Sequence, residues 1–326
     1  MSVLVLVEHA AGGPDDVSRQ ALTLARGYAE AAGGPVEAVL IGADAAAAAA
    51  GLGDLGVATA HVAVHDGLAA YAPQAWGRTL AELIERLAPA AVIAPGSERA
   101  TEAMAHAAAI ADLPLAANCI EAAPGDPATV TRLRWGGSLL EQARLHGAVK
   151  LLTVAPHAVE VQPAAAPGQA TVSEFTPALH DADVVARVSE RTHTDTGGGV
   201  SLADAKAVVT GGRGVGSAEG FAPIQALAAA LGGAVGCSRA VTIAGWRPHT
   251  DQVGQTGTKI APEIYIPCGV SGATQHMAGC KGAKRILAIN TDPDAPIVAN
   301  ADYAVIGDLH EVVPAITAEI AKARGG

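Results

Sequence analysis

The sequence predicts an α/β protein with two domains: an N-terminal parallel-sheet α/β domain with additional mixed strands, followed by a smaller doubly wound α/β domain. Three observations lead to this prediction. Apolar strands alternate with helices up to Pro114, strands without long helices follow it, and the alternation resumes near Ala205. Strands that alternate with helices are typical of parallel β-α-β units. The chain of 326 residues is also longer than one hydrophobic core usually fills.

The first part of the N-terminal domain carries the β-α alternation. Its predicted strands are short apolar runs, as strands buried on both faces require: Val3–Val7, Val36–Ile41, Thr59–Val64 and Ala91–Ala94. The predicted helices cover Pro14–Ala32, Ala45–Leu52 and Pro73–Leu87, and a fourth begins at Gly96-Ser97-Glu98 and ends near Ile110. Proline and two aspartates start the first helix, and Gly33-Gly34 ends it.

After Pro114 the pattern changes to strands alone. The predicted strands there are Thr129–Leu133, Ser138–Leu145, Val149–Val154, Ala170–Phe175 and Asp183–Val188. No long helix separates them, so we expect a mixed sheet in this part of the domain.

A segment without periodicity separates the domains. Ser189–Ser201 contains three successive glycines and no apolar pattern, which is typical of a linker. We therefore predict an N-terminal domain over residues 1–193, a linker over 194–202 and a C-terminal domain over 203–326.

The C-terminal domain returns to β-α alternation. Its predicted strands are Ala205–Thr210, Ala234–Ser238, Ile264–Ile266, Arg285–Ile289 and Tyr303–Ile306. Helices are expected over Ser217–Leu231, from Arg239, after Ser271 and over Leu309–Arg324. Polar residues or glycines follow several of these strands, and in doubly wound folds ligands bind outside the carboxyl ends of the strands.

Composition narrows the classes of partner. The net charge is −11, and the excess lies before residue 201, because residues 201–326 hold ten Lys and Arg against ten Asp and Glu. An acidic surface disfavours nucleic acid and anionic membranes. No apolar run approaches a transmembrane length, and the opening residues show no secretory signal. Four cysteines without a C-x-x-C pair favour reduced thiols in a cytoplasmic protein.

Two glycine-rich turns in Asp251–Lys281 predict a cofactor site. Gln252–Gly257 reads QVGQTG and Ser271–His276 reads SGATQH, and they flank the apolar run Ile264–Ile266. Glycine lets backbone N–H groups approach a ligand closely. A strand that feeds such a turn and a helix start commonly presents N–H groups to phosphate.

Three further residues suggest ligand contacts, each with a plainer alternative. Gly211–Gly216 reads GGRGVG but does not match the G-x-G-x-x-G spacing, because residue 217 is serine. Arg213 in this turn suits an anion or a surface ion pair. Arg239 opposes a helix dipole, which favours a ligand over a solvent-facing position. His276 is either a ligand contact or a structural histidine.

The sequence offers little for hydrolytic or nucleophilic chemistry. Ser271 lacks a G-x-S-x-G setting, and we find no P-loop, no HExxH and no paired histidine ligands. The predicted site therefore binds and tunes a cofactor, and does not supply an acid, base or nucleophile.

Several segments together carry a family resemblance. They are GGRG at 211–214 with Ser217, QVGQTG at 252–257 and PEIYIPCGVSGATQHMAG at 262–279, followed by residues 290–297 and 301–303. In them the sequence resembles the alpha subunit of electron transfer flavoproteins. The resemblance is close across residues 206–322, and it extends to the N-terminal domain through the opening VLVLVEH and the order of strands and helices.

The resemblance implies that the second domain binds flavin adenine dinucleotide (FAD). It also implies a heterodimer with a beta subunit, which in this family usually holds AMP. The implied residues beside the isoalloxazine ring are Arg239, Thr256 and His276. Further implied cofactor contacts are Arg213, Ser238, Gln252, Val253, Gly254 and Gln255, with Ser271, Gly272, Ala273, Thr274 and Gln275 near the ribityl chain and pyrophosphate, and Asn290, Asp308 and Leu309 at the adenosine end.

The implied function is that of an electron carrier, not of an enzyme with its own substrate. Single electrons would pass from flavin dehydrogenases, such as the acyl-CoA dehydrogenases of fatty acid β-oxidation, to a quinone oxidoreductase. A donor at His276 and the cation of Arg239 would favour negative charge on the flavin in a low-dielectric pocket. Two alternatives stay open: a flavin-bifurcating form with a second FAD in the partner, and a nicotinamide-dependent dehydrogenase.

Overall fold

A computed structural model describes residues 1–10, 13–188 and 200–324 of the chain. The chain divides into two compact units, residues 1–192 and 193–326, which we describe separately. The linker predicted over 194–202 falls largely outside the described residues.

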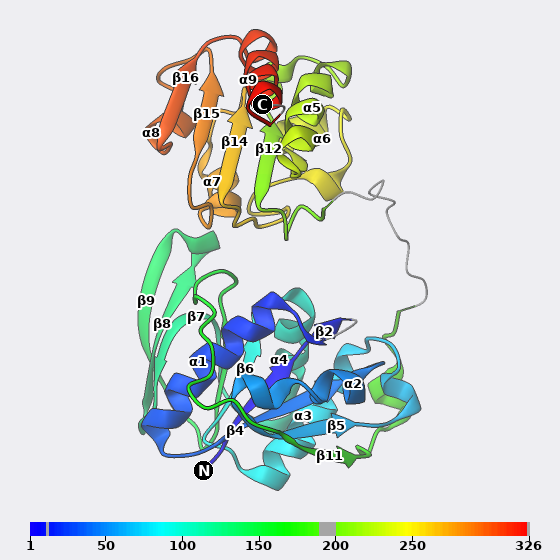
Figure 1. Ribbon diagram of the computed structural model, residues 1–326. Helices are drawn as coiled ribbons and strands as arrows, with labels where there is room; N and C mark the ends of the chain where they lie inside the picture. The colour runs from blue at the N-terminus through cyan, green and yellow to red at the C-terminus, as the bar shows by residue number, and fades with distance from the viewer. Residues whose placement is uncertain (11–12, 189–199, 325–326) are drawn as a thin grey trace. The chain divides into compact units, whose positions relative to one another are not determined.

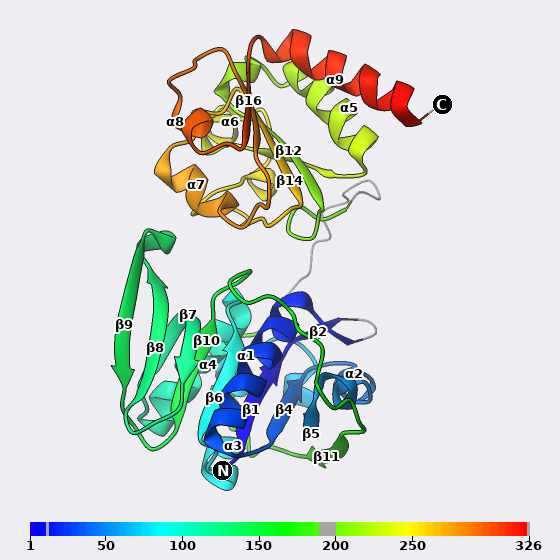
Figure 2. The ribbon, with the colours of Figure 1, turned by 60° about the vertical axis from the view of Figure 1, so that its left-hand side comes forward.

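The N-terminal unit is built on one nine-stranded sheet with the order β11-β5-β4-β1-β6-β10-β7-β8-β9 (Figures 1 and 2). Neighbouring strands run parallel from β11 to β7, whereas β8 and β9 continue it as antiparallel strands. The bounds are β1 Val3–Val7, β4 Val36–Ile41, β5 Val57–Ala63, β6 Ala91–Pro95, β7 Leu115–Ala123, β8 Ala128–Arg134, β9 Leu139–Leu145, β10 Lys150–Val154 and β11 Thr171–Phe175. A two-stranded ribbon pairs β2, His9–Ala10, with β3, Gly13–Pro14.

Helices cover both faces of the middle of this sheet, which explains why central strands such as β1 and β6 are apolar and buried throughout. Residues 3, 5 and 7 of β1 pack in the core beneath α1, Asp16–Ala32, and α2, Ala45–Ala49. Leu4 and Leu6 pack in the opposite core beneath α3, Pro73–Leu87, and α4, Glu98–Ala111. The side chains of Asp15 and Ser97 accept hydrogen bonds from backbone N–H groups at the starts of α1 and α4.

Three predictions about the N-terminal unit were wrong. Residues 183–188 form no strand; a 3-10 helix spans Asp181–Val184, where the buried Asp183 carboxylate accepts from the His180 N–H at 2.9 Å. Strand β7 was missed, because Asn118 takes a positive φ of 60° and a register shift breaks the alternation. Pro14 belongs to β3, so α1 begins at Asp16.

The C-terminal unit is a smaller parallel sheet with the order β13-β12-β14-β15-β16. Its strands are β12 Ala207–Gly211, β13 Ala234–Cys237, β14 Ile264–Cys268, β15 Leu287–Asn290 and β16 Tyr303–Ile306. Helices α5 Ala222–Leu231 and α9 Leu309–Arg324 pack together, and the short helices are α6 Arg239–Ile243, α7 Thr274–Cys280 and α8 Pro296–Ala299. This is the predicted doubly wound fold. Helix α8 was not predicted, and α5 begins five residues later than expected.

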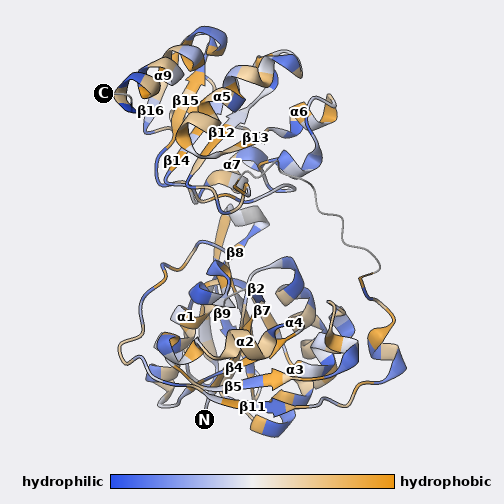
Figure 3. Cartoon of the chain, turned by 45° about the vertical axis from the view of Figure 1, so that its right-hand side comes forward, coloured by the Kyte–Doolittle hydropathy of each residue, from blue (hydrophilic) through white to orange (hydrophobic). Residues whose placement is uncertain are grey.

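In the C-terminal unit, the most hydrophobic residues are those of the sheet. Figure 3 shows strands such as β14 and β15 in hydrophobic colours and helix α9 with hydrophobic and hydrophilic colours alternating along it. The β14 side chains Tyr265 and Ile266 lie in opposite cores, as expected for a strand buried on both faces. Within the described ranges, no helix is long and apolar enough to span a membrane.

Candidate functional site

The candidate site lies where the strand order of the C-terminal sheet reverses. From β12 the chain adds β13 on one side and then β14 on the other, so the connections after β12 and β14 diverge at their carboxyl ends. This switch point is where doubly wound folds bind ligands.

The loops after β12 and β14 touch through their backbones. The Gly212 N–H donates to Cys268 O at 2.9 Å, and the Gly214 N–H donates to Gly269 O at 3.1 Å. A Cβ atom added at Gly212 would lie 2.1 Å from Gly269 O. Only glycine allows this approach, because real Cβ contacts do not occur at that distance.

A second glycine contact holds the QVGQTG turn against α7. A Cβ atom at Gly279 would lie 2.3 Å from the backbone N of Gly254, which has a φ of +150°. The Gln255 N–H donates to Gln275 O at 2.7 Å. The two glycine-rich segments that the sequence singled out therefore form one continuous surface.

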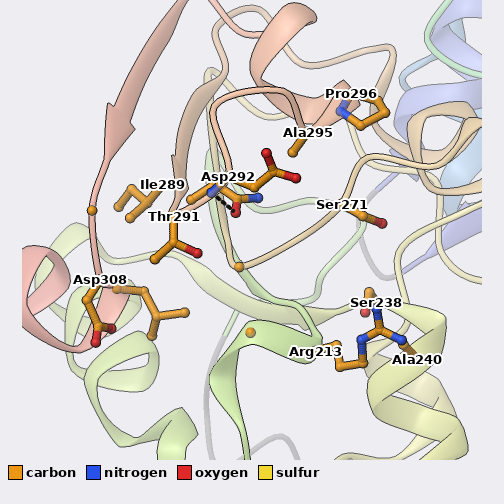
Figure 4. Close-up of a pocket in the computed structure, with 15 residues that line it drawn as sticks. Arg213, Ser238, Ala240, Ser271, Ile289, Thr291, Asp292, Ala295, Pro296 and Asp308 are labelled. Carbon is orange, nitrogen blue, oxygen red and sulfur yellow. Dashed lines mark hydrogen bonds between the residues drawn. The ribbon is translucent and has the colours of Figure 1, made fainter.

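Two adjoining cavities, of about 450 and 200 Å³, lie along this edge of the sheet. They share Ser238, Ala240 and Ser271 in their linings. The larger cavity, shown in Figure 4, continues to the ends of β15 and β16, and the smaller one to the QVGQTG turn and α7. Together they form an elongated groove that suits a ligand with two chemically different ends.

The structure brings fifteen of the seventeen predicted site residues to the lining of this groove. Those in the larger cavity are Arg213, Asn290, Asp308 and Leu309; those in the smaller one are Arg239, Gln252, Val253, Gly254, Gln255, Thr256, Ala273, Gln275 and His276; Ser238 and Ser271 line both. Gly272 and Thr274 do not line it. Gly272 is buried against α8, where an added Cβ would lie 2.3 Å from Ile297 N, and Thr274 is exposed at the start of α7.

Sequence reasoning missed other lining residues, most of them small. These are Gly214, Ala240, Gly269, Val270, Ile289, Thr291, Asp292, Ala295, Pro296 and Gly307. A signal was available for seven of them, because they belong to segments that resemble the family: Gly214, Gly269, Val270 and the four residues within 290–297. Ala240 carries no chemical signal, since only its position one residue from a predicted site residue marks it.

A buried glutamine fixes the smaller cavity. The Gln252 side chain, 2% exposed, accepts from Thr242 Oγ1 at 2.8 Å and donates to Thr256 Oγ1 at 3.0 Å. Gln252 therefore positions Thr256 at the cavity wall.

An asparagine holds the larger cavity open at its far side. The Asn290 Nδ2 donates to Val270 O at 2.8 Å, and its Oδ1 accepts from the Asp292 N–H at 3.1 Å. The Ile297 N–H donates to Ser271 O at 3.1 Å. These bonds tie the loop after β14 to the segment that follows β15.

The charged groups of the groove are separated along it. Arg213 and Arg239 are exposed, and among the described residues neither forms an ion pair. Figure 4 shows the guanidinium of Arg213 next to Ser238, whereas Asp292 and Asp308 come from the β15 and β16 side. The region around the shared wall thus offers cations to an anion, and the β15 and β16 side offers carboxylates to hydroxyl or amino groups.

His276 is the buried polar group of the smaller cavity. It is 7% exposed, and its Nε2 lies 2.6 Å from the Tyr265 hydroxyl. Burial lowers the pKa of His276 to about 4, so the ring is neutral at pH 7. Its Nδ1 has no hydrogen-bond partner within the described part of the chain.

The four cysteine thiols are expected to have low reactivity. All four cysteines are unpaired and buried, and burial raises the pKa of each thiol to about 12. Within the ranges that the structure describes, no group of His, Cys, Asp or Glu is arranged to hold a metal ion.

Two family models match the chain. The model described as electron transfer flavoprotein domain matches residues 3–180, and the one described as electron transfer flavoprotein FAD-binding domain matches residues 201–281. Together they cover most of both units.

Curated relatives match along almost the whole chain. An electron transfer flavoprotein subunit alpha from Mycobacterium leprae is 38% identical over 325 residues, 99% of either chain. One from Mycobacterium tuberculosis H37Rv is 40% identical over 326 residues, again 99% of either chain. A third, from Bacillus subtilis, is 33% identical and covers 97% of this chain and 96% of its own.

Proposed function

The chain belongs to the electron transfer flavoprotein alpha-subunit family, and from this premise we propose that its groove binds FAD and that the protein is a one-electron carrier. The proposed donors are flavin dehydrogenases, including acyl-CoA dehydrogenases of fatty acid β-oxidation. The proposed acceptor is a respiratory protein such as a quinone oxidoreductase. We propose that the carrier is a cytoplasmic heterodimer whose beta subunit holds AMP.

The observation that carries this proposal is the elongated groove at the switch point of the C-terminal sheet. Its walls approach one another at Gly212 and Gly269, and again at Gly254 and Gly279, where a Cβ atom would close the cradle. The Nδ1 of His276, which has no hydrogen-bond partner among the described residues, is a buried polar atom of a lining residue. A buried polar atom without a partner is costly, so a ligand edge that hydrogen-bonds to it fits the site.

The charge separation suggests how FAD lies in the groove. We assign the isoalloxazine ring to the smaller cavity with Arg239, Thr256 and His276. We assign the pyrophosphate to the shared wall near Arg213 and Ser238, the region of positive charge, and the adenosine to the larger cavity. There Asn290, Asp308 and Leu309 form the lining, and the Asp308 carboxylate suits ribose hydroxyls.

When bound, FAD supplies the one-electron chemistry, and the residues of this chain set its environment. Arg239 is the cation of the smaller cavity, and its charge favours electron density on the ring beside it. His276 is neutral at pH 7, so it contributes a hydrogen bond and not a charge. Gln252 and the glycine contacts hold the walls rigid, which reduces the reorganisation that electron transfer requires.

The test is the cofactor content of the chain co-purified with its beta subunit. We expect one FAD and one AMP per heterodimer, measured by flavin absorbance and by chromatography of the released nucleotides. Two FAD per heterodimer would instead support the flavin-bifurcating form. A colourless heterodimer that binds NAD would contradict the proposal and support the nicotinamide-dependent dehydrogenase.

A further inference from the structure

A tyrosine and a histidine from neighbouring elements form a buried pair behind the smaller cavity. Tyr265 lies in β14 and is 0% exposed, and His276 lies in α7. The Tyr265 hydroxyl is 2.6 Å from His276 Nε2, and the two ring planes differ by 28° with their centroids 6.2 Å apart. His276 reaches the cavity, whereas Tyr265 is not part of its lining.

The direction of this hydrogen bond follows from the protonation of both groups. Burial raises the pKa of Tyr265 well above its usual value, so the phenol keeps its proton. A neutral imidazole carries one proton on one of its two nitrogens. Among the described residues, the printed hydrogen-bond partner of the Tyr265 hydroxyl is His276 Nε2, so a phenol that donates there does not leave its buried proton without an acceptor. With Nε2 accepting from the phenol, the ring proton is on Nδ1.

We propose that Tyr265 is a positioning residue whose hydroxyl donates to His276 Nε2, so that Nδ1 carries the ring proton and offers an N–H to the electron-rich edge of the bound flavin. The proposal rests on the proposed function and adds a residue that does not touch the ligand. No covalent step and no charge on His276 is involved.

The alternative tautomer shows what the pair accomplishes. With the proton on Nε2, the lone pair of Nδ1 would face the electron-rich ligand edge. Acceptors would then oppose one another in a buried place, where unpaired polar groups are costly. The Tyr265 donor removes this arrangement and holds the plane of the imidazole at the same time.

The direct test is the tautomer of His276 in the heterodimer labelled with ¹⁵N-histidine. Long-range ¹H–¹⁵N correlation spectra distinguish protonated from unprotonated ring nitrogens, and the His276→Asn variant identifies the signals. We expect the Nδ1–H form in about fivefold excess or more, the ratio that one net hydrogen bond supports. A predominant Nε2–H form in the unmodified protein would overturn the proposal without any Tyr265 variant.

The matched variants are Tyr265→Phe, which removes the buried hydroxyl, and Tyr303→Phe, which removes one from a 65% exposed tyrosine. We expect Tyr265→Phe to bring the tautomer ratio toward one, to weaken FAD binding about fivefold and to shift the flavin midpoint potential. Tyr303→Phe should change none of these. An unchanged tautomer ratio in folded Tyr265→Phe would refute the positioning role.

The two proposals fail separately. If the unmodified heterodimer binds no FAD, the proposed function fails, while the tautomer ratio is still measurable. If it binds FAD with His276 in the Nε2–H form, only the role of Tyr265 fails.

Discussion

Each unit of this protein has a cavity at the carboxyl ends of its parallel strands, and the two cavities are lined differently. In the N-terminal unit, a cavity of about 290 Å³ lies beyond β1 and β4. Its buried Glu8 accepts from Ser97 and pairs with Arg99 at 3.2 Å. In the C-terminal unit, glycine backbones and the neutral His276 form the walls, and the two arginines make no ion pair among the described residues.

The difference shows that both sheets form a cavity at the carboxyl ends of their strands, and that the residues lining it determine whether it is suited to a ligand. At the N-terminal edge, the Glu8 carboxylate already interacts with the Ser97 hydroxyl and the Arg99 guanidinium, so its partners come from the same unit. At the C-terminal edge, a buried nitrogen and two exposed cations are left for a ligand. The same architecture therefore hosts a closed polar cluster in one unit and a candidate cofactor site in the other.

The largest expected effect comes from adding one methyl group to the C-terminal edge. Gly279→Ala places a Cβ 2.3 Å from the Gly254 backbone, so α7 and the QVGQTG turn must separate. We expect a loss of about 3 kcal/mol or more in unfolding free energy and at least about tenfold weaker FAD binding. Urea unfolding and flavin retention after gel filtration measure the two effects. Full flavin retention in this variant would show that the glycine contact is dispensable.

Lowering the pH should reduce the unfolding free energy of the C-terminal unit, because His276 becomes protonated more readily in the unfolded chain. Its folded pKa is about 4 against an ordinary value of 6.5, so the unfolded chain gains the proton first as pH falls. Stability present above pH 6.5 is therefore lost between pH 6.5 and 4, by about 3 kcal/mol. The measurement compares urea unfolding of the FAD-free chain at several pH values with that of His276→Gln. Parallel pH curves for both proteins would contradict the expected contribution.

The N-terminal unit should respond to pH in the opposite direction. Burial raises the pKa of Glu8, and the hydrogen bond from Ser97 opposes this only in part. Stability from this group is present below the unfolded pKa of 4.5 and is lost as pH rises through the folded value. The substitution Glu8→Gln changes the unfolding free energy at each pH. We expect this change to be about 1 kcal/mol more stabilising at pH 7 than at pH 4. Hydrogen exchange of β1 peptides would report the change.

The smallest expected effect is that of Gly27→Ala, which serves as the control for Gly279→Ala. Gly27 also lies within a helix, α1, but an added Cβ there meets nothing within 4 Å. Gly27→Ala should therefore stabilise the N-terminal unit by about 0.5–1 kcal/mol, because alanine is the better helix former. Flavin retention should not change. Destabilisation by Gly27→Ala would mean that helix propensity does not explain the contrast with Gly279→Ala.

Much of the fold could be predicted because both sheets are covered on two faces. Strands such as Val36–Ile41 and Tyr303–Ile306 and helices such as Pro73–Leu87 and Leu309–Arg324 have the predicted bounds. The errors fall where a local interaction overrides the pattern. Asp183 uses its carboxylate as a cap, and the irregularity at Asn118 hides a strand.

The candidate site could be located from the sequence but not completed. Glycines and polar residues after strands marked the groove, because backbone approach and hydrogen bonding require those residue types. The wall residues Ala240 and Val270 have no such requirement, and the burial of Gly272 against Ile297 depends on the unpredicted helix α8. The contact of Tyr265 with His276 likewise needs the register of β14 against α7.

The backbone contacts of Gly212 and Gly214 with Gly269 also determine where this protein can be engineered. No other residue fits between these loops, so the floor of the groove is intolerant of substitution. Arg213 and Arg239, in contrast, line the exposed rim of the groove. Libraries that aim to retune the affinity for an anionic ligand should therefore vary the rim and leave the floor as it is.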